Sequence, residues 1–246
     1  FATNALNKID LPSFDLTKSF RFGDNYAKTL ESNLNSLYEI TKTRLLKISG
    51  VETNTKIGRE FINFSKPFCV IARSTFGLIQ QLVYFIHDKK KIYFEGGYNS
   101  YSFMNQTVYS IFYLKQKKND KITIDEIKDF ETIAELEQFA KDTKNQDYLN
   151  IIKFINTYGD NIFEINKKIK EFLVNDKKDA DIIFTTTHKS KGLEYEQVIM
   201  ADDFISKKEI TNTKNKLSFQ RINEELNIYY VAEKKKKNAI QLADLN

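Results

Sequence analysis

The sequence predicts an α/β protein in which a parallel sheet flanked by helices is interrupted by an all-helical segment. Short apolar runs occur at residues 66–75, 90–97, 180–187 and 196–204, and helical patterns lie between or after them. Runs of this kind are typical of parallel strands, which are buried on both faces. Between residues 98 and 175 only helical spacing is found, so the sheet is expected to be split there.

The first elements form a strand–helix–strand order. Residues 1–23 have few periodic signals and are predicted to be a connector. A helix is expected to begin at Asp24, which can cap it, and to end at Gly50. The strand at 66–75, the helix that Gly77 opens and the strand at 90–97 then give a βαβ unit.

The middle of the chain is predicted to be a helical subdomain over residues 98–178, between sheet segments at 1–97 and 179–246. Its helical patterns cover residues 101–115, 124–143, 146–159 and 161–175. The acidic residues of the second pattern are interpreted as a solvated helix face, because they lack the context of a metal site: Asp125, Glu126, Asp129 and Glu131. After residue 180 the α/β pattern resumes, with a helix over 219–234 and a last strand over 238–244.

Composition limits the class of protein. The chain has 246 residues, of which 41% are hydrophobic, enough for one large domain or two modest ones. The sequence contains no run of about 18 apolar residues, so no membrane span is predicted. The first residues lack the form of a secretory signal. The single cysteine, Cys69, excludes a disulfide framework within the chain and is expected to be a core residue. We therefore expect an intracellular, cytoplasmic protein that binds no membrane.

The charge permits nucleic-acid binding without requiring it. The net charge is +5, with a pI near 8.9. Lysine accounts for all but five of the 38 basic residues, so a run of lysines carries little information. The arginines are Arg21, Arg44, Arg59, Arg73 and Arg221.

The stretch "TTTHKSKGLE" at residues 185–194 is polar and basic although it lies between two apolar strands. Ligands of open parallel sheets bind beyond the carboxyl ends of the strands, where this stretch begins. Hydroxyls, an imidazole, lysines and a helix N-terminus after Gly192 would suit a phosphate, and Glu194 could accept hydrogen bonds from a sugar. The alternative is an ordinary polar loop that leads into a capped helix.

The same stretch resembles motif V of superfamily 1 DNA helicases of the UvrD/Rep type, whose core is T-x-H-x-[SA]-K-G-L-E. Together with "DDF" at 202–204 it is most similar to the F-box DNA helicase branch and its bacterial relatives. Further motifs follow in the expected order: "SFRFG" resembles the N-Y-R-S element, "FCVIARST" the strand with an A-R-[TS] tail, "IKDFETIAELEQFA" the helical insertion, and "EELNIYYVA" the opening of motif VI.

The resemblance implies that the chain is the second RecA-like motor domain of a helicase, with its helical insertion. It places Phe20 on the adenine of ATP and Arg21 on the γ-phosphate. Gly192 and Glu194 would lie at the nucleotide, with Glu194 on the ribose.

The resemblance also implies a nucleic-acid side of the site. Its residues would lie near single-stranded DNA: Arg73, Thr187, His188 and Lys189.

Two departures from the family pattern bear on catalysis. The chain has no G-x-x-x-x-G-K-[ST] loop and no acidic Mg²⁺ motif, so alone it is not expected to hydrolyse ATP. The metal ligands are expected in the first motor domain, upstream or in another chain, and residues 1–6 resemble the tail of motif III. Motif VI has Lys234-Lys235-Lys236 in place of Thr-Arg-Ala, so Lys235 takes the position of the second arginine that contacts the γ-phosphate, and we count it as catalytic with Arg21.

Two functions stay open. The first is the carboxyl-terminal half of an ATP-dependent 3′-to-5′ helicase or translocase on single-stranded DNA, which uses ATP and Mg²⁺ and works with the first motor domain. A nuclease or another protein could be a further partner. The second is a non-catalytic nucleic-acid-binding or scaffolding module derived from such a motor, which the altered motif VI favours.

Overall fold

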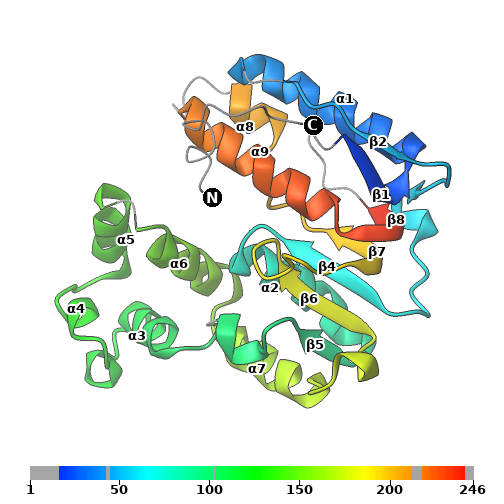
Figure 1. The fold of residues 1–246 in the computed structure, drawn as a ribbon. Coiled ribbons are helices and arrows are strands. Elements are labelled where there is room, and N and C mark those ends of the chain that lie inside the picture. Colours follow the sequence, from blue (N-terminus) through cyan, green and yellow to red (C-terminus); the bar gives the residue numbers. More distant parts are fainter. Residues whose placement is uncertain (1–16, 43–44, 102, 144, 212–217, 242–246) are drawn as a thin grey trace. The chain divides into compact units, whose positions relative to one another are not determined.

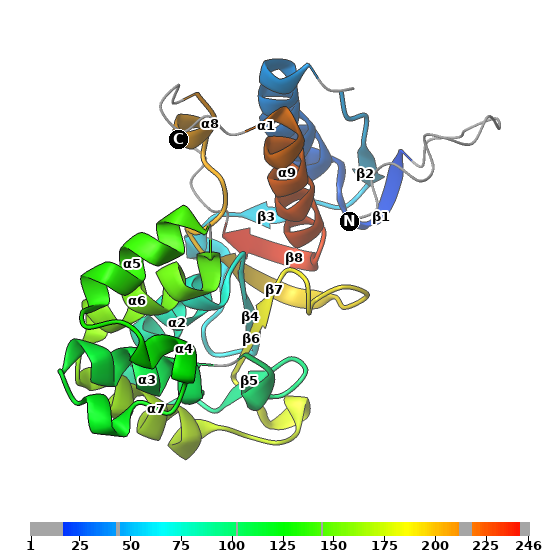
Figure 2. The ribbon, with the colours of Figure 1, turned by 90° about the vertical axis from the view of Figure 1, so that its left-hand side faces the viewer.

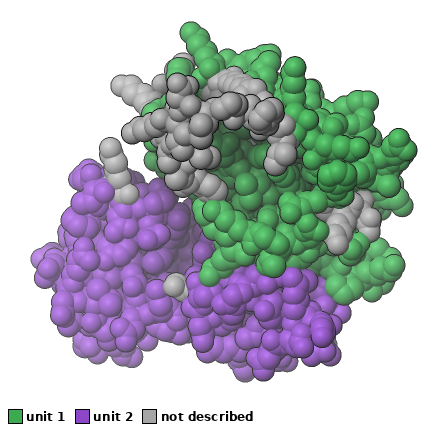
Figure 3. Space-filling view, in the orientation of Figure 1, with its two compact units in different colours: residues 1–73, 185–246 green, residues 74–184 purple. Residues whose placement is uncertain are grey.

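The computed structural model describes residues 17–42, 45–101, 103–143, 145–211 and 218–241, and its parallel strands and flanking helices confirm the predicted α/β class (Figure 1). The chain forms two compact units (Figure 3). Unit 1 comprises residues 1–73 and 185–246, and unit 2 comprises residues 74–184. The resemblance of residues 1–6 to motif III lies outside the described residues.

Unit 1 is built on a parallel sheet. Its strands follow the order β3, β8, β7 and β4, where β3 is Lys56–Ile57, β8 is Lys236–Gln241, β7 is Tyr195–Met200 and β4 is Phe68–Ala72. All five residues of β4 are buried, as the apolar run predicted. Cys69 lies in this strand opposite Val198 and is part of the core, as expected.

A second, two-stranded parallel sheet corrects the expectation of a connector. Residues Lys18–Gly23 form β1, which pairs with β2 at Ser49–Val51. The Ser49 N–H donates to the carbonyl of Thr17 at 2.7 Å. Because the partner strand lies far along the chain, the local pattern of residues 17–23 could not predict this strand.

Helix α1, Asp24–Thr41, is shorter than predicted. It buries Tyr26, Leu30, Leu34 and Leu37 on one face. Lys42 ends it by adopting a left-handed conformation, with φ of 54°, and its N–H bonds to the carbonyl of Glu39 at 3.3 Å. The prediction that Gly50 ends the helix is therefore wrong, and Gly50 lies in β2.

Helix α1 lies beside α9, Phe219–Glu233, as Figures 1 and 2 show. Ser218 caps α9 by accepting from the N–H of Arg221. Polar contacts join the two helices, because the Thr41 hydroxyl donates to the Asn223 side chain at 2.9 Å. A short helix, α8 at Lys207–Thr211, precedes α9, and a Ser206–Glu209 capping pair opens it.

Unit 2 contains the helices of the predicted insertion. They are α3 Gln106–Lys115, α4 Asp125–Lys128, α5 Ile133–Asp142, α6 Gln146–Tyr158 and α7 Asn161–Phe172. Asn105, Thr132 and Asn145 each accept a backbone N–H at the start of a helix, which explains where α3, α5 and α6 begin.

Unit 2 also contains α2, one further strand and the first part of another, so its limits are wider than the predicted insertion. Helix α2, Thr75–Phe85, is followed by β5, Ile92–Phe94, which pairs in parallel with β6, Ile182–Thr186. The division between the units falls within β6. The domain limits at 97/98 and 178/179 stay predictions.

The membrane and metal-binding expectations concern helices and side-chain clusters of the described residues. No helix among them has the length and apolar character needed to cross a membrane. Within the same residues, no group of three or more His, Cys, Asp or Glu side chains could hold a metal ion. In α4, Asp125 is exposed and pairs with Lys128 at 2.7 Å.

Candidate nucleotide and nucleic-acid site

The loop at residues 187–194 joins β6 to β7 through a series of turns. The N–H of Ser190 donates to the Thr186 carbonyl at 3.0 Å, and the N–H of Leu193 donates to the Ser190 carbonyl at 3.0 Å. The Ser190 hydroxyl, which is buried, donates to the Thr187 carbonyl at 2.9 Å. Gly192 has φ of +79°, a conformation that glycine adopts readily.

No helix begins in this loop, so the predicted helix N-terminus after Gly192 is wrong. The chain enters β7 at Tyr195, soon after the turn, and leaves no residues in which a helix could start. Any anion bound here would therefore meet side chains and turn N–H groups instead of a helix dipole.

Arg21 lies beside the loop. Its Nε donates to Oε1 of Glu194 at 2.5 Å, although 173 residues separate the two in sequence. Both side chains are partly accessible, at 40% for Arg21 and 32% for Glu194. The neighbouring Phe20 is 79% exposed, with the Lys18 ammonium 5.6 Å from its ring centroid. The aromatic ring and the guanidinium are thus both presented on the surface.

Lys235 belongs to the same site. It follows α9, and its carbonyl accepts from the Tyr195 N–H at 2.8 Å. The side chain is buried, and burial lowers the pKa of the Lys235 ammonium below its ordinary value. The positive charges of Arg21, Lys234 and Lys191 lower it further, while Glu194 opposes them. Arg21, Lys191 and Lys235 therefore form a cationic cluster that includes one carboxylate, a set of charges suited to a polyanion.

Lys191 is one of the loop lysines expected to suit a phosphate, although the family resemblance gave it no separate role. Its charge lowers both the pKa of Lys235 and the pKa of His188. Its place inside the motif was the sole sequence signal, and in a lysine-rich chain that signal is weak.

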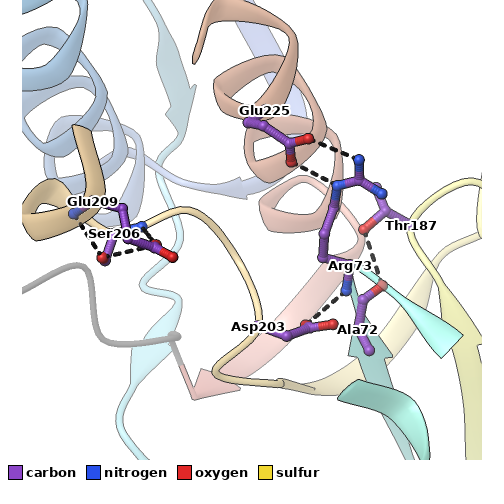
Figure 4. A network of polar contacts seen from close by, with 7 residues as sticks. All are labelled: Ala72, Arg73, Thr187, Asp203, Ser206, Glu209 and Glu225. Carbon is purple, nitrogen blue, oxygen red and sulfur yellow. Dashed lines mark hydrogen bonds and ion pairs between the residues drawn. The ribbon is translucent and has the colours of Figure 1, made fainter. Parts of the chain in front are cut away.

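Arg73 makes its contacts within the protein (Figure 4). Its N–H donates to Asp203 at 2.8 Å. Its guanidinium binds Glu225 of α9 through two hydrogen bonds, of 2.6 and 2.8 Å. These contacts differ from the single-strand contact that the sequence suggested, which stays a prediction.

Thr187 is fully buried, and its N–H donates to the Ala72 carbonyl at 3.0 Å. The burial favours a part in holding the loop over direct contact with a ligand. His188 and Lys189, by contrast, are exposed at the start of the loop.

The pKa of His188 is lowered from 6.5, first by partial burial and then by the charges of Arg73 and Lys191, while Glu225 opposes the shift. The unfolded chain therefore binds more protons near pH 6, so His188 costs stability as the pH falls below 6.5 and costs nothing well above it. We expect His188→Gln to reduce the loss of thermal stability between pH 7 and pH 5. Melting curves across this range check this, with His87→Gln as the control, and an unchanged pH dependence would contradict it.

The amino-acid sequence of the chain matches a known protein family. Residues 4–242 match the family described as the UvrD-like helicase C-terminal domain, and the chain belongs to this family. It is also 30% identical over 125 residues to the F-box DNA helicase protein 1 of Schizosaccharomyces pombe. That match covers 48% of the chain and 14% of the yeast protein. The resemblance read from the motifs is thereby confirmed.

Proposed function

We propose that this chain is the carboxyl-terminal motor half of an ATP-dependent helicase or translocase that moves 3′-to-5′ on single-stranded DNA. The observation that supports it best is the Arg21–Glu194 ion pair beside buried Lys235. Arg21 and Glu194 come from two motifs, and the N–H of Tyr195, the residue after Glu194, donates to the carbonyl of Lys235 in a third. Three motifs distant along the chain therefore meet in one cationic cluster. A nucleoside triphosphate is a ligand of suitable charge for that cluster.

Five residues in and around the cluster then have defined tasks. Arg21 and Lys235 stabilise the negative charge that develops on the transferred phosphoryl group. Phe20, which is exposed, offers a platform for the adenine. The turn at Gly192 brings Glu194 to the site, where its carboxylate accepts hydrogen bonds from the ribose. ATP supplies the phosphoanhydride bond that is cleaved, and we assign the Mg²⁺ ligands to the first motor domain, upstream or in a partner chain.

The nucleic-acid side uses His188 and Lys189, which are exposed on the same loop. A loop that contacts both ligands offers a direct route by which DNA binding could alter the nucleotide site. Contacts to the phosphate backbone make the affinity fall steeply with salt. The 3′-to-5′ direction rests on the family resemblance.

Glu194→Ala is expected to weaken nucleotide binding about tenfold or more, the effect of losing hydrogen bonds to a charged acceptor. Binding of single-stranded DNA is expected to change less, because the carboxylate faces Arg21 instead of the DNA side. Titration of the complete protein with a fluorescent ATP analogue and, separately, with an oligonucleotide measures both affinities. A larger loss of DNA affinity than of nucleotide affinity would contradict the assignment of this motif to the nucleotide. Glu196→Ala, which changes an exposed neighbour, serves as the control.

The function itself is tested by ATP hydrolysis in the complete protein, with and without single-stranded DNA. Hydrolysis that rises with DNA supports the motor. Hydrolysis that stays at background with DNA present supports the alternative, a non-catalytic module that binds nucleic acid. The observation that favours the alternative is Lys235, which stands where the family has arginine.

A further inference from the structure

We propose that Arg73 is a positioning residue that acts through Glu225 to hold α9, and with it Lys235, in place. This inference rests on the proposed function. It gives Arg73 a task different from the DNA contact that its motif suggested, and it gives Glu225, which no motif singled out, a part in the motor.

The first support is the geometry of the pair. Two parallel hydrogen bonds join the Arg73 guanidinium to the Glu225 carboxylate, so one full edge of the guanidinium faces the protein. The two side chains are 29% and 19% exposed, which reduces screening by solvent. The pKa of Arg73 is raised, chiefly by its hydrogen bonds to Glu225. A phosphate would have to compete with this carboxylate for the same edge.

The second support is the place of Arg73 in the fold. It follows β4 at the carboxyl edge of the sheet, and its N–H bonds to Asp203 in the segment after β7. The residue before it, Ala72, accepts the N–H of Thr187 from the β6–β7 loop. Residues 72 and 73 therefore connect the β6–β7 loop, the segment after β7 and helix α9 at one point, as Figure 4 shows.

The third support is the position of Glu225 on α9. From Glu225 the helix runs about 12 Å to its last residue, Glu233, at 1.5 Å per residue. Lys235 lies two residues beyond that end, after the cap residue Lys234, and its carbonyl accepts from the Tyr195 N–H. A helix is stiff over this length, so a shift at Glu225 would be transmitted to Lys235. Displacement of a catalytic group by about 1 Å can lower a rate about 10²-fold.

The test compares Arg73→Lys and Glu225→Gln in the complete protein. Each is expected to lower kcat for DNA-stimulated hydrolysis at least about tenfold. The DNA concentration for half-maximal rate and its dependence on salt should not change. The exchanged pair Arg73→Glu with Glu225→Arg is expected to recover part of kcat. Glu224→Gln is the matched control, since Glu224 pairs with Gln220 on its own helix, and it should leave kcat unchanged.

A direct DNA contact predicts the opposite results. Glu225→Gln would then leave kcat unchanged, the exchanged pair would recover nothing, and Arg73→Ala would reduce the salt slope of DNA affinity by about 0.7, the value for one phosphate of a single strand. Any of these outcomes would overturn the inference.

A second measurement separates this inference from the proposed function. If the wild-type protein shows no DNA-stimulated hydrolysis, the proposed function fails by itself. Hydrogen exchange at residues 226–235 then reads the positioning of α9 directly. Faster exchange there in Arg73→Lys and Glu225→Gln, but not in Glu224→Gln, supports the inference. Equal exchange in all three variants overturns it.

Discussion

Replacing Arg21 by alanine is expected to lower DNA-stimulated ATP hydrolysis in the complete protein by at least about 10³-fold, the typical effect of losing an arginine finger. The fold should persist, because the side chain is 40% exposed and its ion pair with Glu194 is accessible to solvent. Steady-state hydrolysis and thermal unfolding, measured on the same preparations, separate the two effects.

Two companion variants sharpen this result. Arg21→Lys keeps the charge but loses the planar fork, so its rate should lie between those of the wild type and the alanine variant. Arg221→Ala removes an exposed arginine of α9 and should retain full activity. Turnover that survives in Arg21→Ala would mean that Arg21 serves the structure alone.

Lys235 gives the second large effect, and here the two substitutions act in opposite directions. Lys235→Ala should lower the rate at least about 10²-fold, because the phosphoryl group loses a buried cation. Lys235→Arg should raise the rate above wild type, because arginine adds a bidentate fork at the position that the family gives to arginine. Single-turnover hydrolysis with saturating DNA measures both changes.

Lys207→Met, which changes an exposed lysine of α8, is the control for the Lys235 variants. If Lys235→Arg unfolds at the wild-type temperature and still hydrolyses ATP no faster, Lys235 has no contact with the transition state. The non-catalytic interpretation would then gain support.

The strands and helices that were predicted correctly are those whose own residues decide the structure. Strand β4 is uniformly apolar, and the spacing of apolar residues in α9 is that of a helix with one buried face. Strand β1 was missed because its partner, β2, is distant in sequence. The end of α1 was missed because it depends on a left-handed lysine, Lys42, a conformation that sequence seldom reveals.

The features of the candidate site also differ in how far the sequence could predict them. The motif resemblance assigned Arg21 and Glu194 to one nucleotide site, which stays a prediction, and the structure joins the two side chains in an ion pair. A motif carries information on distant contacts that periodicity lacks. The resemblance did not reveal the partner of Arg73. Glu225 is one of several acidic residues on or near α9, and the chain pattern does not distinguish the one that faces the sheet. The buried environment of Lys235 was equally invisible in a run of four lysines.

The turn at Gly192 restricts this position in an unusual way. A methyl group added there would meet no atom within 4 Å, so size is no obstacle. The obstacle is handedness, since at φ of +79° every L-amino acid with a side chain is strained, whereas the mirror-image D-alanine would adopt the same angle without difficulty. The position therefore disfavours L-amino acids because of their handedness and not because of the size of the added methyl group.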